Sequence, residues 1–120
     1  MRTVSRLLLI GAVLAVSACA PASRFEWGTY ESTLYAYSKT PEAKEAYRNS
    51  LVAALRNGEA SNRVAPGLNA ELGYLYMEEG RTAEAIQCFE AEKRLFPEAQ
   101  QFMDGVIIRL RSGESVGANR

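Results

Sequence analysis

Apolar residues between positions 25 and 111 recur at helical spacing, and glycine or proline interrupts the pattern at short intervals. Tyr30, Leu34 and Tyr37, for example, stand at i, i+4 and i+7, which places them on one face of a helix. No segment shows a competing strand pattern. The sequence therefore predicts an all-α fold of about five short helices.

Proline and glycine set the predicted boundaries of the first two helices. The first is expected to end near Lys39, because Pro41 disfavours helical geometry at the residue before it. Thr40 is expected to cap the second helix. That helix is predicted to end near Arg56, with Gly58 supplying a left-handed ending.

The later boundaries follow the same logic after a predicted polar connector over residues 57–63. Gly80 is expected to close the third helix, Thr82 to cap the fourth and Pro97 to end it. A last apolar face, interpreted as a solvating cap on the array, comprises Phe102, Val106, Ile107 and Leu110.

The segment LGYLYMEEGRTAEAIQCFEAEKRLFPEA, residues 72–99, resembles a tetratricopeptide repeat. Gly73 and Ala85 stand where two helix backbones approach closely in such repeats, and Tyr76 and Phe89 stand where aromatic rings fill the groove beside them. The resemblance implies a short TPR-like (tetratricopeptide-repeat-like) helical hairpin array.

Two positions depart from the repeat, and a second, weaker match to its pattern lies upstream. Asn69 stands where the repeat prefers tryptophan, and Glu92 where it prefers alanine. Ala43 and Tyr47 stand in the same relation as the later Ala–Phe pair, but 42 residues earlier rather than about 34.

Residues 1–18 have the features of a cleaved secretory leader, with two arginines followed by an apolar run over residues 7–16. This run would span about 15 Å as a helix, about half the hydrocarbon thickness of a bilayer. The segment VSAC resembles the lipobox of bacterial lipoproteins, which implies cleavage before Cys19 and lipid attachment to its sulfur. The alternative is an ordinary secreted protein in which Cys19 is incidental. Ala20, rather than aspartate, after the cysteine implies the outer membrane, with the body on the periplasmic side.

The predicted organisation thus has four parts. The leader covers residues 1–18, a lipidated tether 19–24, the helical domain 25–111, and a polar, disordered tail 112–120.

The segment FEWGTYESTLYAYSKTPE, residues 25–42, together with LGYLYMEEGR, is similar to a family of small, largely uncharacterised proteobacterial outer-membrane lipoproteins. Members tend to be encoded beside a CsgG-like lipoprotein, similar to the curli-secretion channel protein, and a third small lipoprotein. The resemblance implies a part in an envelope assembly, with other envelope lipoproteins as partners, and no established activity.

Composition excludes several classes of function. Removing the leader leaves twelve basic and fourteen acidic side chains, and no positive face of the kind that nucleic acid requires. The chain has no histidine, which removes the usual general base and the commonest metal ligand. We therefore expect no nucleic acid, metal, cofactor or small-molecule substrate, and no enzymatic activity.

Three residues are candidates for contact with a partner. Tyr74 and Met77 fall on positions that face the concave groove in similar repeats. Trp27 could rest against the lipid headgroups or anchor a partner. The structural interpretation, which we favour for Trp27, is that it packs on the first helix pair and fixes where the tether enters the fold.

Four further side chains have both a chemical and a structural interpretation. Glu78, Glu79 and Glu84 could form a carboxylate pair for glycoside chemistry, but their positions favour solvated helix ends. Cys88 could be reactive, but an inert, partly buried thiol is favoured since no histidine can activate it.

These observations favour a lipid-anchored adaptor or accessory subunit of an outer-membrane assembly. One alternative is an enzyme or accessory factor of peptidoglycan metabolism that uses the acidic residues around Glu78. Another is a lipid-tethered subunit that associates only with itself.

Overall fold

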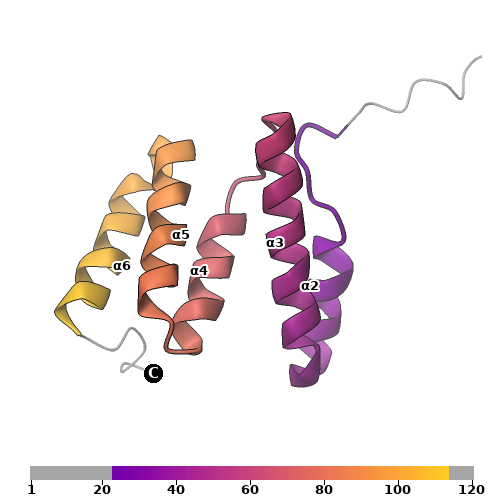
Figure 1. The fold of residues 1–120 in the computed structure, drawn as a ribbon, viewed down its shortest axis with the longest axis horizontal. Helices are drawn as coiled ribbons and strands as arrows, with labels where there is room; N and C mark the ends of the chain where they lie inside the picture. The colour runs from indigo at the N-terminus through magenta and orange to yellow at the C-terminus, as the bar shows by residue number, and fades with distance from the viewer. Residues whose placement is uncertain (1–22, 114–120) are drawn as a thin grey trace, which may run out of the picture.

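Five α-helices dominate residues 23–113, the part of the chain that this computed structural model describes (Figure 1). The predicted leader, Cys19 and most of the predicted tail lie outside these residues. The helices are α2 (Tyr30–Lys39), α3 (Lys44–Ser61), α4 (Leu68–Glu78), α5 (Thr82–Leu95) and α6 (Gln100–Ser112), with short 3₁₀ turns η2 (Pro41–Ala43) and η3 (Pro97–Ala99). The all-α prediction of about five helices is confirmed.

The helices alternate in direction and follow one another across the molecule, from α2 on one side to α6 on the other (Figure 1). The main contacts join consecutive helices: α2 with α3, α3 with α4, α4 with α5, and α5 with α6. Such an order gives the molecule two broad faces and leaves one side of each end helix without a neighbour.

The predicted end of the first helix is confirmed at Lys39, and Thr40 takes the predicted N-cap position before Pro41, whereas the predicted cap at Thr82 is wrong. Thr40 makes no side-chain capping bond, because Pro41 opens a 3₁₀ turn in which the Ala43 N–H bonds to the Thr40 carbonyl (3.0 Å). Thr82 is the first residue of α5 rather than its cap. The cap position belongs to Arg81, whose side chain pairs with Glu84.

The prediction that α3 ends near Arg56 is also wrong, since the helix continues to Ser61 and Asn62 takes the left-handed conformation (φ 54°). Gly58 is buried inside the helix instead of ending it. A Cβ atom at Gly58 would lie 2.8 Å from the Val64 Cα. Gly58 therefore leaves room for the chain to pass close to α3 after the helix ends. The connector, predicted over residues 57–63, is found over residues 62–67.

Buried side chains form two core clusters that share α4. The first cluster lies among α2, α3 and α4, and its buried members are Tyr47, Leu51, Ala54, Leu55, Ala65, Leu68, Leu72 and Leu75. The second lies among α4, α5 and α6, with Ala85, Phe89, Met103, Val106 and Ile107 buried. Tyr76 packs against both clusters, so the core is continuous through α4.

The close approach predicted for α4 and α5 is confirmed by the residues that motivated it. A Cβ atom at Gly73 would lie 2.7 Å from the Phe89 ring, and both Phe89 and Ala85 are 0% exposed. Only a residue without a side chain leaves room for this ring between the two helices.

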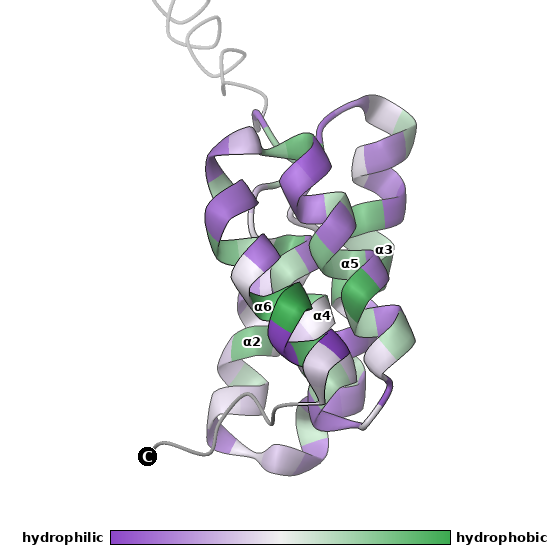
Figure 2. Cartoon of the chain, turned by 90° about the vertical axis from the view of Figure 1, so that its left-hand side faces the viewer, coloured by the Kyte–Doolittle hydropathy of each residue, from purple (hydrophilic) through white to green (hydrophobic). Residues whose placement is uncertain are grey.

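The predicted apolar face of α6 needs one correction. Val106 and Ile107 are buried as expected, but Phe102 is 60% exposed and Met103, 3% exposed, takes the place assigned to it. The inward stripe runs through positions 103, 106, 107 and 110, and Phe102 lies outside it by about one residue's rotation of 100°. Figure 2, in which α6 faces the viewer, shows hydrophobic segments on this end helix.

Candidate functional site

The N-terminal segment enters the fold beside the loop between α3 and α4. The Glu26 N–H donates to the Arg63 carbonyl (2.8 Å), and the two side chains form an ion pair (3.0 Å). The Arg63 guanidinium also donates to the Ser23 carbonyl. One arginine therefore holds the first described residues to the loop between α3 and α4.

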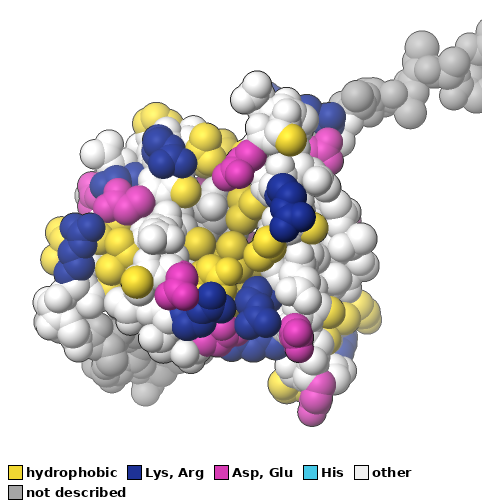
Figure 3. Space-filling model, in the orientation of Figure 1, with side chains coloured by type: hydrophobic (Ala, Val, Ile, Leu, Met, Phe, Trp, Pro, Cys, Tyr) yellow, Lys and Arg dark blue, Asp and Glu magenta, His cyan; other side chains and the backbone are white. Residues whose placement is uncertain are grey.

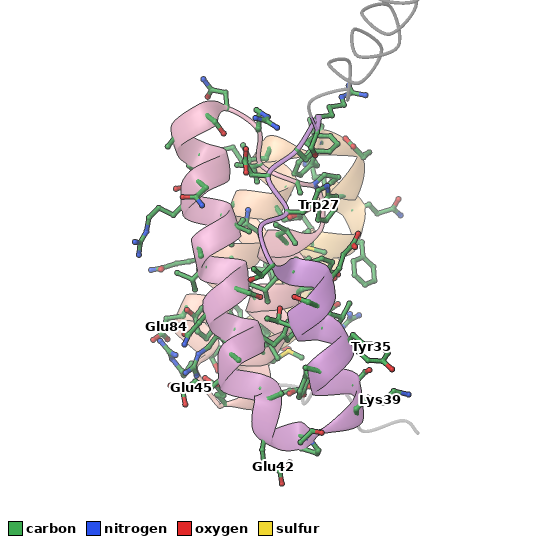
Figure 4. All side chains as sticks on the ribbon, turned by 90° about the vertical axis from the view of Figure 1, so that its right-hand side faces the viewer. Trp27, Tyr35, Lys39, Glu42, Glu45 and Glu84 are labelled. Carbon is green, nitrogen blue, oxygen red and sulfur yellow. The ribbon has the colours of Figure 1, made fainter. Side chains whose placement is uncertain are left out.

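Trp27 lies on this same segment, near the end of the molecule where the chain enters (Figure 4). It is partly buried against the first core cluster, with its ring 5.5 Å from that of Tyr30 and 6.3 Å from that of Phe25. This placement agrees with the packing interpretation of Trp27. Contact with a partner or with lipid stays a prediction.

Behind Trp27, two tyrosines share one carboxylate. The Tyr30 hydroxyl donates to Glu71 Oε1 (2.6 Å), and the Tyr47 hydroxyl donates to Glu71 Oε2. Tyr37 stacks on Tyr47 with ring centroids 5.4 Å apart. Burial, and then the hydrogen bond to Glu71, raise the pKa of Tyr30 to about 12.

A groove of about 360 Å³ runs over α4 between α3 and α5. Hydrophobic side chains fill this hollow in Figure 3, and charged side chains border it. Leu72 and Tyr76 come from α4, and Val52 and Leu55 from α3. The rest of the lining is formed by Arg56, Glu59, Glu84, Gln87 and Cys88. An apolar floor with a mixed-charge rim suits the side chains of another polypeptide.

Cys88, on the α5 wall of the groove, is a partly buried free thiol. Burial raises its pKa to about 11, and the nearby Arg81 offsets this only in part. A thiol of this pKa is almost wholly protonated at neutral pH, and the thiolate is the nucleophilic form. The structure thus agrees with an inert Cys88.

The three acidic residues considered for glycoside chemistry are all ion-paired near one end of the bundle. Glu78 pairs with Lys44 (2.9 Å) and Glu79 with Arg48 (2.9 Å). Glu84 pairs with Arg81 (3.1 Å), and its pKa is lowered by its own backbone N–H and by this arginine. This arrangement is the one expected of solvated helix ends, and Glu84 lies far along the molecule from Trp27 (Figure 4).

The structure places Tyr74 and Met77 outside the groove. Both are partly buried against the second core cluster, and the Tyr74 ring meets Phe89 edge-on at 5.2 Å. Burial raises the pKa of Tyr74. Tyr74, Met77 and Trp27 are therefore not brought together, and partner contact at these three residues stays a prediction.

Asn69 and Glu92, the two departures from the repeat, are buried polar residues (5% and 3% exposed). Glu92 lies on α5 and accepts the Gly67 N–H (2.6 Å) at the start of α4. Burial raises its pKa, while the backbone N–H groups of Gly67, Ala70 and Asn69 lower it. Glu92 therefore caps α4 from the neighbouring helix, because the first backbone N–H groups of a helix have no partner within it.

Two negative findings apply to residues 23–113. No group of three or more histidine, cysteine, aspartate or glutamate side chains there could hold a metal ion. No helix in this range is long and apolar enough to cross a bilayer.

Sequence reasoning missed Glu71, Glu92 and the groove. The six tyrosines were a signal that could have suggested hydroxyls in need of a hydrogen-bond partner, but not which carboxylate supplies it. The groove depends on how α3 and α5 flank α4, for which the sequence carries no local signal.

Comparison with known proteins gives a family but no function. The family described as Domain of unknown function (DUF4810) matches residues 25–106, which run from just after the predicted tether to the middle of α6. No curated protein and no solved structure matches the chain. The chain belongs to the DUF4810 family, an uncharacterised family as its sequence resemblance implied.

Proposed function

We propose that this protein is a lipid-anchored adaptor of the bacterial envelope, whose helical body holds another envelope protein near the outer membrane. The proposal combines a feature of the sequence, the lipobox resemblance at Cys19, with a feature of the fold, the groove over α4. The similarity of the α4–α5 pair to a tetratricopeptide repeat supports it, since such arrays present grooves to other polypeptides.

The groove is the observation that carries the proposal. Its floor contains Tyr76, an amphipathic ring of the kind enriched at protein interfaces, and its rim carries Arg56 and Glu84 of opposite charge. Because the rim has both signs of charge, it can orient a bound segment without attracting polyanions. A CsgG-like lipoprotein is the partner that the family resemblance suggests.

The tether keeps this groove close to the bilayer. Three residues lie between Cys19 and Ser23, and the four residue steps from one to the other span at most about 14 Å. Arg63 fixes the other end of the tether to the fold through the Ser23 carbonyl and Glu26. A partner bound over α4 would therefore be held within a few tens of ångströms of the membrane.

Photocrosslinking in cells tests the adaptor role. A photoreactive residue replacing Gln87, an exposed residue of the groove lining, is expected to give one discrete adduct with another envelope protein. The matched control is the same residue at Tyr35, which is 67% exposed on α2 and outside the groove. Equal adducts at both positions, or none at Gln87, would contradict the adaptor proposal.

Mass spectrometry of the purified protein tests the anchor separately. The matured chain is expected to begin at an acylated Cys19, and Cys19→Ser is expected to release the protein from the membrane fraction and abolish the Gln87 adduct. A chain that begins elsewhere, or that carries a free thiol at Cys19, would contradict the anchor whatever the crosslinking result.

A further inference from the structure

The outer face of α6 carries large apolar side chains that nothing in the described chain covers. Phe102 is 60% exposed and Ile108 is 65% exposed, and they stand about 120° apart around α6, on either side of Gly105. Figure 2 looks directly at this end of the molecule. Exposed apolar groups of this size on one helix face are typical of an interaction surface.

Gly105 lies between these two side chains, and no internal contact explains it. A Cβ atom there would meet only Arg109 Nη1, at 4.0 Å, which is ordinary contact. Glycine in a helix interior is destabilising relative to alanine. A glycine on an outer face does, however, allow another backbone to approach closely.

The glycine forms the floor of a shallow depression on α6. This depression has a volume of about 470 Å³ and is lined by Glu98, Gln101, Phe102, Gly105 and Arg109. The acidic residue thus lies at one end of the face and the basic residue toward the other. Neither Glu98 nor Arg109 forms an ion pair with another described residue.

We propose that this face binds the same face of a second copy of the chain, with the two α6 helices antiparallel and a twofold axis passing near Gly105. In this register the two glycines face each other, and Phe102 of each copy lies level with Ile108 of the other, on either side of the glycines. Each Glu98 comes within about one helical turn of the other copy's Arg109, so both charges gain a partner across the interface. A parallel pairing would instead place like charges together.

The self-complementary charges are what select a second copy over an unrelated helix. A twofold interface uses one patch twice, so a patch with acid at one end and base at the other matches itself when reversed. The contact is small, because one pair of 13-residue helices buries less than the roughly 1,600 Å² of a stable complex. The dissociation constant is therefore expected to be on the order of 10 µM or weaker.

The pairing does not depend on the proposed lipid anchor, but it is compatible with one. The twofold axis is perpendicular to both α6 helices, so the two tethers lie at the same level along the axis. Both tethers can therefore reach one bilayer when a broad face of the dimer lies along the membrane. Confinement to that bilayer would raise the effective concentration and favour the weak dimer.

Cysteine crosslinking of the purified full chain tests the geometry. In a Cys88→Ser background, Gly105→Cys is expected to give a dimer with a short bismaleimide crosslinker, while Tyr35→Cys gives no more dimer than the parent. Phe102→Cys mixed with Ile108→Cys is expected to crosslink more than either variant alone. Equal dimer at positions 105 and 35, or no dimer at position 105, would overturn the proposal.

Sedimentation equilibrium of the same purified protein tests the energetics. Ile108→Asp is expected to weaken association at least tenfold, and Tyr35→Asp, an equally exposed control, to leave it unchanged. Glu98→Arg alone should weaken the dimer, and adding Arg109→Glu should restore it. A wild-type chain that stays monomeric to millimolar concentration, or a double variant no better than the single, would overturn the proposal.

Discussion

Glu92 stabilises the junction of two helices with one carboxylate. Its side chain reaches from α5 to the Gly67 N–H, at the turn that begins α4, and it is 3% exposed. Oε2 makes no hydrogen bond in the described structure, so burial is only partly compensated. A buried carboxylate with one unpaired oxygen favours its protonated form, which agrees with its raised pKa.

The raised pKa of Glu92 predicts a pH dependence of stability. Because the folded state holds this proton more tightly than the unfolded state, its contribution is complete below the ordinary pKa of 4.5 and is lost as pH rises through the raised value. The free energy of unfolding of Glu92→Gln, measured in urea from pH 4 to pH 7, should not show this loss. Glu92→Ala should cost about 1–3 kcal/mol at pH 4, because it leaves the Gly67 N–H without its acceptor.

Glu45→Gln is the matched control, since it removes an exposed carboxylate from α3. It should keep the wild-type pH profile. Parallel profiles for wild type and Glu92→Gln would show that burial does not set the protonation of Glu92.

Single residues differ in how far the sequence reveals their role. The close contact at Gly73 and Phe89 was predictable, because both residues belong to one hairpin and a small residue opposite an aromatic ring is a local pattern. The cap formed by Glu92 was not, since it depends on where the chain before α4 passes relative to α5. The sequence showed Glu92 only as a departure from the repeat.

Among the helices, α2 is held by a polar contact as well as by packing. Tyr30 of α2 and Tyr47 of α3 both donate to Glu71 of α4, so one carboxylate joins three helices. Hydrogen bonds to a charged acceptor contribute about 1.5–3 kcal/mol. Glu71 is therefore expected to matter more for stability than the exposed carboxylates that follow it on the same helix.

Replacing Glu71 should change both stability and the titration of Tyr30. Glu71→Ala is expected to lower the free energy of unfolding by about 1.5–3 kcal/mol, because it leaves the buried Tyr47 hydroxyl without an acceptor. Glu71→Gln should lower the pKa of Tyr30 from about 12, as seen by ultraviolet titration of the phenols. The contribution of Tyr30 to stability is complete below pH 10 and is lost as pH rises to about 12.

Glu78→Gln provides the control on the same helix, because its pair with Lys44 is exposed and worth at most about 1 kcal/mol. It should leave the Tyr30 titration unchanged. An equal loss of stability in Glu71→Ala and Glu78→Gln would refute the special role of Glu71.

The ends of the helices were predictable where proline sets them and less so where glycine does. Lys39 ends α2 as Pro41 requires, since the ring restricts the preceding backbone whatever the tertiary contacts. Gly58 carried the same signal as Gly80, but only Gly80 adopts positive φ at a helix end. Gly58 instead leaves room for Val64, and no local sequence pattern predicts this contact.

At the scale of the whole molecule, α4 determines whether the chain behaves as one unit. The two core clusters have no buried residue in common, yet Tyr76 packs against both and α4 contributes to each. The groove over α4 exists because α3 and α5 both rest on this helix. Its position follows from how three consecutive helices pack against one another, so sequence patterns predicted the helices but not the groove.

A core substitution at one end should therefore unfold the other end. Val106→Ala removes two methyl groups from a side chain that is 0% exposed in the second cluster, which should cost about 1.5–3 kcal/mol. Trp27, the only tryptophan, reports on the first cluster by its fluorescence. If α4 couples the clusters, the substitution lowers the urea midpoint measured by Trp27 fluorescence as much as the midpoint measured by circular dichroism. An unchanged Trp27 midpoint beside a lowered dichroism midpoint would mean that α2 and α3 unfold independently, and that the groove over α4 can open without disturbing the tethered end.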